Sequence, residues 1–441
     1  MFDASSKETK AAMLKEIGIE NIEELFKDIP SDLKQAKFNL PAALDEQDLT
    51  KHIKALAAKN KPLVNFAGAG IYEHFIPAVV NALSTRGEFL TAYTPYQAQA
   101  SQGTLQAIYE YQSSICSLFD MEVSNASHYD GATALSEAVY AACQIKGMNK
   151  VLISSGLNPQ YKQVLKTYFN GTREIRFEEV SLKEGTLDIQ DLKDKLQTPS
   201  AAFVLATPNF FGCLEEAQEI SKLVHGSNAL LISVVNPISL GILETPGSYD
   251  SDFAVAEGQC LGNAMNFGGP GLGIFTCKKQ YVRYMSGRLC GITKDDKGNR
   301  CFVLTLQARE QHIRRERAAS NICSNQALCA LNALIYLSLL GPKGLKEVAL
   351  LNLEKAHNLA KEISKIKGFS LAYQKQFFNE FIVNCPIPAK QVIAKLAKKG
   401  ILAGYDLGQI DKSLKNSLLI CATETKTEQD IENFISCLRG I

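Results

Sequence analysis

Short apolar runs recur along the chain at a spacing that constrains its fold more than any other feature. The runs lie at 151–154, 201–206, 229–235, 253–256 and 273–276. They lack the polar alternation of a half-exposed strand, and segments with helical periodicity separate them. Strands of this kind are buried on both faces, and helices between them favour a parallel sheet that is covered on both sides. The sequence therefore predicts an α/β fold, with any ligand site in the loops after the carboxyl ends of strands, such as 207–212 and 236–241.

The pattern changes on both sides of this region, which predicts three domains. Residues 1–60 read as short charged helices, one of them at 45–58, and are interpreted as a helical arm. Residues 61–330 are predicted to form the large α/β domain. A charged helix is expected over 304–328, with a solvated face favoured over an anion site. Residues 331–441 are predicted to form a small C-terminal α+β domain. Its predicted elements are helices at 345–365, 389–399 and 428–437 and strands at 380–385 and 417–422.

Composition excludes several classes of protein. A formal net charge of +1 over 441 residues provides no basic face for nucleic acid. The twelve cysteines are scattered singly, so no metal site is predicted, and reduced thiols in a cytoplasmic protein are expected. The N-terminal residues include acidic side chains and no apolar core of signal-peptide length. The apolar stretch 327–340 is interrupted by Asn332 and Ser338, so it is predicted to be a buried helix and not a membrane span.

A polar loop between residues 91 and 103 holds a high density of uncharged hydrogen-bonding groups. Its candidate site residues are Tyr93, Thr94, Tyr96, Ser101 and Gln102. Gly103 leads from this loop into a segment with one apolar helical face. The first amides of a helix have no partner within the helix, so a small-ligand site with an uncharged lining is one prediction. A tyrosine-rich subunit interface is an equally weighted alternative.

Three stretches of the chain resemble a known family. They are AYTPYQAQASQGTLQA at 92–107, YDGATALSEA at 129–138 and QAREQHIRRERAASNICSNQAL at 307–328. All three resemble subunit 1 of bacterial glycine dehydrogenase (decarboxylating), the alpha half of the glycine cleavage system P-protein where that protein is split into two chains. The resemblance extends over the whole chain. It implies fold type I of the pyridoxal-phosphate enzymes, which is aspartate aminotransferase-like, with a large parallel-sheet domain and a small C-terminal domain.

The resemblance also implies an activity and partners. The complex would take glycine, release CO2 and transfer the aminomethyl group to the lipoyl arm of the H-protein. The expected partner is glycine dehydrogenase subunit 2, with two copies of each chain in the assembly. Pyridoxal phosphate would be carried by that partner, and no membrane is involved.

The residues that a pyridoxal-phosphate site needs are missing here. By resemblance to the catalytic half of the P-protein, the lysine that forms the internal aldimine corresponds to Gln259 when counted back from the Gly-Gly-Pro-Gly turn at 268–271. It corresponds to Cys260 when counted forward from Pro246-Gly247 and Asp252. No lysine occurs between Lys222 and Lys278. Asn236 stands where a carboxylate is expected near the pyridine nitrogen. We therefore predict that this chain binds no cofactor covalently, and Gly103 and Asn236 are candidates for proximity to it.

Two glycine-containing loops are candidates for phosphate sites. In the phosphate-loop candidate at 129–133, Asp130 would repel a phosphate. The Gly-Ala-Gly sequence at 68–70 fails as a dinucleotide fingerprint because Glu73 occupies the sixth position, so a tight turn beside the polar loop is the preferred interpretation.

The other ionisable residues near these segments are interpreted as structural or as less favoured candidates for a site. His74 and His128 flank the polar stretch and are more often structural than catalytic at such positions. Glu257 is interpreted as a hydrogen-bonded structural carboxylate near the degenerate site. Lys278 and Lys279 remain alternatives for a cofactor lysine, although they follow the Gly-Gly-Pro-Gly turn instead of preceding it.

The combined hypothesis is an obligate subunit that contributes Tyr93, Thr94, Tyr96, Ser101 and Gln102 to an active site at the interface. Two alternatives stay open at this stage. The chain could be a structural scaffold without active-site residues, or a self-sufficient pyridoxal-phosphate aminotransferase or decarboxylase.

Overall fold

The computed structural model describes residues 6–34, 39–91, 93–171, 174–318 and 320–441, which form two compact units, Met1–Lys61 and Pro62–Ile441. The first unit is helical, as predicted. Its elements are α1 (Lys7–Ile17), the 3₁₀ helix η1 (Ile22–Phe26), α2 (Ser31–Lys34) and α3 (Glu46–Ala57). Asp45 caps α3, because its side chain accepts a hydrogen bond of 2.8 Å from the Asp48 amide.

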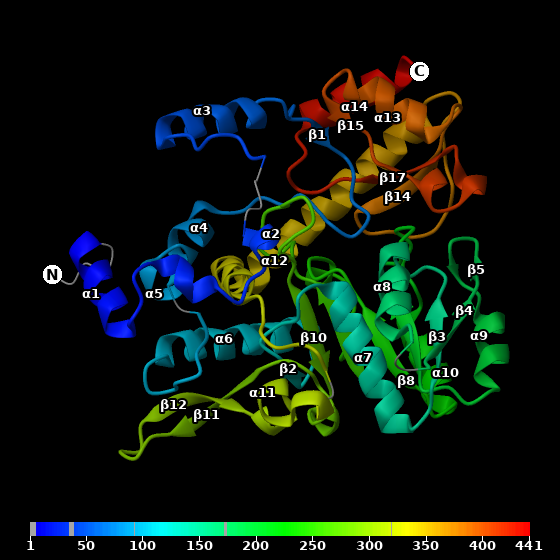
Figure 1. The fold of residues 1–441 in the computed structure, drawn as a ribbon. Helices are drawn as coiled ribbons and strands as arrows, with labels where there is room; N and C mark the ends of the chain where they lie inside the picture. Colours follow the sequence, from blue (N-terminus) through cyan, green and yellow to red (C-terminus); the bar gives the residue numbers. More distant parts are fainter. Residues whose placement is uncertain (1–5, 35–38, 92, 172–173, 319) are drawn as a thin grey trace. The chain divides into compact units, whose positions relative to one another are not determined.

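The second unit is built on a seven-stranded sheet with the order β2-β10-β9-β8-β7-β3-β4 (Figure 1). The strands are β2 (Val123–Ser124), β3 (Lys150–Ser154), β4 (Arg176–Val180), β7 (Ala202–Ala206), β8 (Leu230–Val234), β9 (Phe253–Glu257) and β10 (Gly273–Cys277). Strands β4, β3, β7, β8 and β9 are parallel, whereas β10 runs antiparallel to β9 and β2. The five predicted strands are confirmed. Strands β2 and β4 were not predicted, because one has two residues and the other reads RFEEV.

Helices cover both faces of the sheet, which explains the apolar character of its strands. Helices α7 (Gly131–Lys146) and α8 (Pro159–Phe169) pack on one face with Val151, Ile153 and Val204, whereas α9 (Ile189–Leu196) and α10 (Ala217–Gly226) pack on the other with Leu152 and Phe203. The two sets of strand residues alternate because successive side chains point to opposite faces. Helix α7 crosses the sheet in front of the central strands in Figure 1.

A second helical layer includes α4 (Ala78–Ser84), α5 (Gly87–Leu90), α6 (Gln102–Phe119) and α12 (Ala327–Ser364). By length and composition α12 is the one helix among the described residues that could span a membrane. It has non-helical backbone angles at Gly341, followed by Pro342, and it buries Leu331, Ala333 and Tyr336 in the core. One side of this helix therefore lies in the core, as predicted for 327–340, whereas Leu328 and Leu339 are exposed.

The C-terminal region contains a four-stranded sheet with the order β13-β14-β17-β16. Its elements are β13 (Ser370–Leu371), β14 (Glu380–Asn384), α13 (Ala389–Ala397), β16 (Tyr405–Asp406), β17 (Ser417–Cys421) and α14 (Glu428–Arg439). The second half of α12 packs with α13 and α14 against this sheet. In addition, β1 (Val64–Asn65) pairs in parallel with β15 (Ile401–Leu402). The predicted boundary at residue 331 falls within α12, and the division into three domains stays a prediction.

The prediction of a charged helix over 304–328 is wrong. The hairpin of β11 (Leu289–Lys294) and β12 (Arg300–Thr305) leads into short turns, namely η4 (Gln307–Arg309), α11 (Gln311–Arg314) and η5 (Arg315–Arg317). Leu306 and Arg315 have φ angles of 52° and 53°, which interrupt a right-handed helix. Arg309 also points inward and donates a hydrogen bond of 2.6 Å to the Gly287 carbonyl. The remaining elements are β5 (Leu182–Lys183), β6 (Thr186–Leu187), η2 (Ser239–Gly241), η3 (Lys279–Tyr281), η6 (Leu407–Gln409) and η7 (Lys412–Leu414).

Candidate functional site

A small polar cavity lies at the carboxyl ends of the parallel strands, where ligands bind in sheets of this type. Its volume is about 70 Å³. The polar residues that line it include Asn158, Tyr161, Asn209, Asn236, Glu257 and Glu380. Ligand pockets usually enclose roughly 300–1,000 Å³, so this cavity is too small for a cofactor of drug size.

The Glu257 carboxylate occupies the N-terminus of α7, the position at which a phosphate would bind. Its Oε2 atom accepts a hydrogen bond of 3.0 Å from the Gly131 amide, the first residue of the helix. Its Oε1 atom accepts two hydrogen bonds of 2.9 Å, from the Gln259 and Leu272 amides. The helix dipole favours an anion there, and this chain supplies that anion from its own strand β9.

Further side chains close the same helix terminus. The Asp130 carboxylate accepts a hydrogen bond of 2.8 Å from the Thr133 amide as the cap of α7. The backbone of Gly131 is so closely surrounded that a Cβ atom there would lie 2.2 Å from the Tyr161 hydroxyl oxygen. Burial raises the pKa of Glu257, the three amide donors oppose that shift, and the charge of Asp130 adds to it. A phosphate group does not fit this terminus, because two carboxyl groups already use its amides.

Gln259 and Cys260 lie in the turn after β9 and are both buried. The Gln259 side chain accepts a hydrogen bond of 3.0 Å from the Tyr72 amide and donates one of 2.7 Å to the Asn263 carbonyl. Burial raises the pKa of the Cys260 thiol, which opposes formation of a nucleophilic thiolate. None of the described residues that line the cavity is a lysine. An aldimine-forming cofactor therefore does not fit here.

Asn236 follows β8 and lines this cavity. Its side-chain oxygen accepts a hydrogen bond of 3.0 Å from the Ile238 amide, and its buried Nδ2 atom has no hydrogen-bond partner among the described residues. An amide at this position cannot supply the negative charge that a pyridinium nitrogen requires.

The Gly68–Gly70 turn closes the cavity from the opposite side. The Glu380 carboxylate accepts hydrogen bonds of 2.7 Å from the Ala69 amide and 2.6 Å from the Tyr72 hydroxyl. A Cβ atom on Gly68 would lie 2.3 Å from Glu380 Oε1, so a glycine is needed for this approach. The predicted tight turn is confirmed, but it lines this small cavity. It does not line the cavity beside the polar loop at 91–103, which we call the tyrosine loop.

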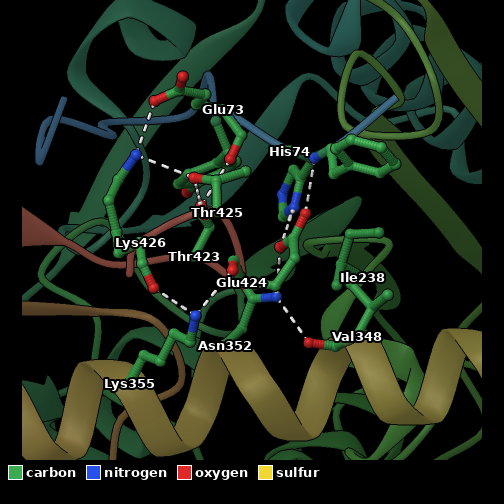
Figure 2. A network of polar contacts seen from close by, with 12 residues as sticks. Glu73, His74, Ile238, Val348, Asn352, Lys355, Thr423, Glu424, Thr425 and Lys426 are labelled. Carbon is green, nitrogen blue, oxygen red and sulfur yellow. Dashed lines mark hydrogen bonds and ion pairs between the residues drawn. The ribbon is translucent and has the colours of Figure 1, made fainter. Parts of the chain in front are cut away.

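A buried polar network holds the segment that follows this turn. Figure 2 shows Glu424 between His74 and Asn352, with Glu73 paired to Lys426. Glu424 lies 2.8 Å from His74 Nδ1 and accepts a hydrogen bond of 2.9 Å from Asn352, which lies on α12. Lys426 lies 2.7 Å from Glu73, and only 4% of its side chain is exposed. His74 therefore has a structural partner, and the network links this segment to the C-terminal region.

The tyrosine loop lines a different cavity, of about 190 Å³. Tyr93 and Thr94 lie on its wall, together with Arg288 and the Tyr111 ring from α6. The Arg288 guanidinium carbon lies 5.4 Å from the centroid of the Tyr96 ring. The prediction of an uncharged lining is therefore wrong, because folding brings a buried cation to this loop from the start of a distant hairpin.

The other loop candidates are placed differently. The Gln102 side chain is used by the hairpin, since it donates to the Phe302 carbonyl and accepts from the Phe302 amide, each at 2.8 Å. Ser101 begins α6 without a side-chain capping bond. Gly103 lines a neighbouring apolar groove with Val79 and Leu83. Gly103 and Asn236 thus lie at separate cavities.

The remaining ionisable candidates have structural partners. His128 is fully buried, its Nε2 atom lies 2.9 Å from the Ser286 hydroxyl, and burial lowers its pKa to about 3. Lys278 forms ion pairs of 2.7 Å with Asp250 and 2.9 Å with Asp252. These pairs raise the pKa of Lys278 against the opposing effect of burial, so it stays protonated and is a poor aldimine former. Among the described residues, no group of three or more His, Cys, Asp or Glu side chains is placed to hold a metal.

Sequence reasoning missed Arg288, Tyr72 and Glu380 as site residues. Glu380 carried one signal, because it is an acidic residue at the start of a predicted strand in an otherwise apolar run. Arg288 carried none, since a single arginine before Leu289 and Cys290 matches no anion-binding motif.

Comparison with known proteins agrees with this architecture. The family model of the glycine cleavage system P-protein matches residues 2–438. A probable glycine dehydrogenase (decarboxylating) subunit 1 from Moorella thermoacetica is 48% identical, with 97% of each chain covered. A protein of the same name from Chlorobaculum parvum is 46% identical, covering 100% of this chain and 99% of the relative.

Solved structures show the same relationship. A crystal structure of glycine decarboxylase (P-protein) of the glycine cleavage system, in inhibitor-bound form, is 39% identical with a TM-score of 0.92, covering 100% of this chain and 99% of that one. Glutamate decarboxylase from Lactobacillus brevis shares the fold with a TM-score of 0.67 at 14% identity, covering 93% of this chain and 96% of that one. The fold is that of the type I pyridoxal-phosphate enzymes. The chain therefore belongs to the glycine cleavage system P-protein family, among the proteins named glycine dehydrogenase (decarboxylating) subunit 1.

Proposed function

We propose that this chain is the subunit of a two-chain glycine decarboxylase that does not carry the cofactor. The observation that carries the proposal is the Glu257 carboxylate on the Gly131 amide, because it fills the anion position at the N-terminus of α7. Gln259 and Cys260 at the predicted lysine position support it. Pyridoxal phosphate is then held by the partner, glycine dehydrogenase subunit 2, in a cytoplasmic complex with two copies of each chain.

The proposed reaction belongs to the complex. It binds glycine, releases CO2 and transfers the aminomethyl group to the lipoyl arm of the H-protein. The cofactor supplies the electron sink for loss of the carboxyl group, so this chain needs only to bind and orient.

The tyrosine loop is the proposed contribution of this chain to the shared active site. Tyr93 is 93% exposed and Tyr96 is 59% exposed, although both are large aromatic residues. Exposed aromatic side chains beside a cavity are typical of surfaces that another protein covers. Thr94 lines the same cavity, and Ser101 and Gln102 support the loop at the start of α6.

Glycine–bicarbonate exchange tests the proposal. It should be measured with this chain alone, with the partner alone and with the two mixed, each supplied with pyridoxal phosphate and H-protein. We expect exchange only in the mixture. Exchange by this chain alone would overturn the proposal in favour of a self-sufficient enzyme, and full activity of the partner alone would leave this chain as a scaffold.

A further inference from the structure

Arg288 is a buried cation that has no counter-ion among the described residues. The residue is 4% exposed. Its one side-chain interaction with the described residues is the stacking of the guanidinium over the Tyr96 ring, at 5.4 Å. It forms no ion pair and donates no side-chain hydrogen bond within that part of the chain. A buried guanidinium normally has a carboxylate or several acceptors, because burial of an unpaired charge is strongly unfavourable.

Arg288 lines the 190 Å³ cavity, and Tyr111 is another of its lining residues. The Tyr111 hydroxyl is buried and has no hydrogen-bond partner among the described residues. Three residues with hydroxyl groups, Thr94, Thr104 and Ser324, also belong to the lining. Neither Asp nor Glu is among the described residues that line the cavity, so nothing in this set neutralises the arginine.

The cavity also joins two segments that are remote in sequence. Tyr93, Thr94 and Thr104 come from one of the stretches that resemble the family, and Ser324 and Asn325 come from another. The lining residues thus include a guanidinium, a phenol and several aliphatic hydroxyls, all of which can donate hydrogen bonds to an oxyanion.

We propose that Arg288 and Tyr111 form a binding site for a small oxyanion, a carboxylate or a phosphate group, beneath the tyrosine loop. Arginine binds both groups through two parallel N–H donors, and the Tyr96 ring restricts the position of the guanidinium. The source of the anion rests on the proposed function. It is either the carboxylate of glycine or the phosphate of the cofactor that the partner presents. The site itself belongs to this chain.

The first test uses the full chain without its partner. Thermal unfolding is followed while sodium acetate or sodium phosphate replaces sodium chloride at constant ionic strength. We expect both oxyanions to raise the unfolding temperature of the wild type and to have no such effect on Arg288→Met. Arg300→Met is the matched control, because the Arg300 guanidinium also stacks on a ring, 5.6 Å from the Phe302 centroid, but the residue is exposed and lies outside the cavity.

The second test uses the complex with the partner subunit. A rise in the KM for glycine of roughly ten- to a hundredfold in Arg288→Met, with a smaller change in kcat, identifies the substrate carboxylate as the anion. Faster loss of pyridoxal phosphate on dialysis, followed by its absorbance, identifies the cofactor phosphate instead. Arg288→Lys should restore part of either effect, and Tyr111→Phe should give a smaller loss of the same kind.

The proposal is overturned if Arg288→Met behaves like Arg300→Met in the titration and in the complex. Its failure can be distinguished from failure of the proposed function. A wild-type mixture without glycine–bicarbonate exchange contradicts the proposed function, whereas the anion titration of the separate chain still decides the site at Arg288.

Discussion

Glu257 accepts a hydrogen bond of 3.0 Å from the Gly131 amide and so provides the anion at the N-terminus of α7 from within the chain. The same carboxylate also accepts the amides of Gln259 and Leu272. The start of α7, the end of β9 and the start of β10 are thereby held together by one side chain. A site that in other type I enzymes could receive a ligand is thus part of the hydrogen-bonded core here.

This relationship predicts that the purified chain forms no covalent adduct with pyridoxal phosphate. After incubation with the cofactor and reduction with borohydride, peptide mass spectrometry should find no phosphopyridoxyl-lysine above the level of surface labelling. The partner subunit treated in parallel is the positive control. A stoichiometric adduct on one lysine of this chain would contradict the prediction.

The close surroundings of Gly131 predict a large effect of a single methyl group. A Cβ there meets the Tyr161 hydroxyl oxygen at 2.2 Å and the Glu257 amide nitrogen at 2.8 Å, so Gly131→Ala should destabilise the chain by about 1–3 kcal/mol. Gly103→Ala is the control, because Gly103 is also in the first turn of a helix but its Cβ would meet nothing within 4 Å. It should stabilise by about 0.5–1 kcal/mol. Urea unfolding measures both, and equal effects would refute the interpretation.

Glu380 predicts a pH dependence of stability. Burial raises its pKa from 4.5 to about 7, while the Tyr72 hydroxyl and the Ala69 amide oppose that shift. Between about pH 4.5 and 7 the folded state holds a proton that the unfolded state has released, so this contribution to stability is present below that range and lost as pH rises through it. The loss is on the order of 3 kcal/mol.

Glu380→Gln tests this dependence, because glutamine keeps the shape and can still accept from Ala69. The free energy of unfolding is measured from pH 4.5 to 8 for both proteins. We expect the free energy of unfolding of the wild type to fall relative to that of the variant as pH rises across this range. A constant difference would show that Glu380 is ionised throughout.

The groove beside α6 predicts the face that binds the partner. It is lined by Val79, Leu83, Gly103 and Leu339, and three of these are exposed apolar side chains. Leu339, which is 53% exposed, is a suitable probe. Leu339→Asp should weaken assembly with subunit 2 by tenfold or more, because it removes the free energy gained by burying one leucine side chain. Lys193→Asp on α9, outside the groove, is the control in analytical ultracentrifugation. Unaltered assembly of Leu339→Asp would exclude this face.

The tyrosine loop predicts a kinetic effect without loss of structure. Tyr93→Phe and Tyr96→Phe each remove one hydroxyl, and loss of one hydrogen bond made in the transition state lowers the exchange rate by roughly tenfold. Assembly should be unchanged, because the rings remain. Unchanged rates in both variants and in the double variant would assign the loop to packing and favour the scaffold alternative.

The sequence alone determined the five long apolar strands of the main sheet in the second unit, β3, β7, β8, β9 and β10. The runs at 253–256 and 273–276, for example, became β9 and β10 because apolar periodicity acts within a window of a few residues. The lack of a lysine between Lys222 and Lys278 was equally visible, since chemistry that is missing from the chain cannot be supplied by folding. The charged stretch at 304–328 failed, because the left-handed backbone at Leu306 and Arg315 is not encoded in helical periodicity.

Only the tertiary structure decided which side chains meet. Arg288 reaches Tyr96 because the β11–β12 hairpin packs on α6, and Glu257 reaches Gly131 because α7 starts beside the end of β9. Glu380 meets Tyr72 across two regions that are far apart in the sequence. Each pair depends on strand order and helix packing, which set distances between segments independently of local pattern. For this reason the long apolar strands could be predicted from the residues, whereas the charge at the tyrosine loop could not.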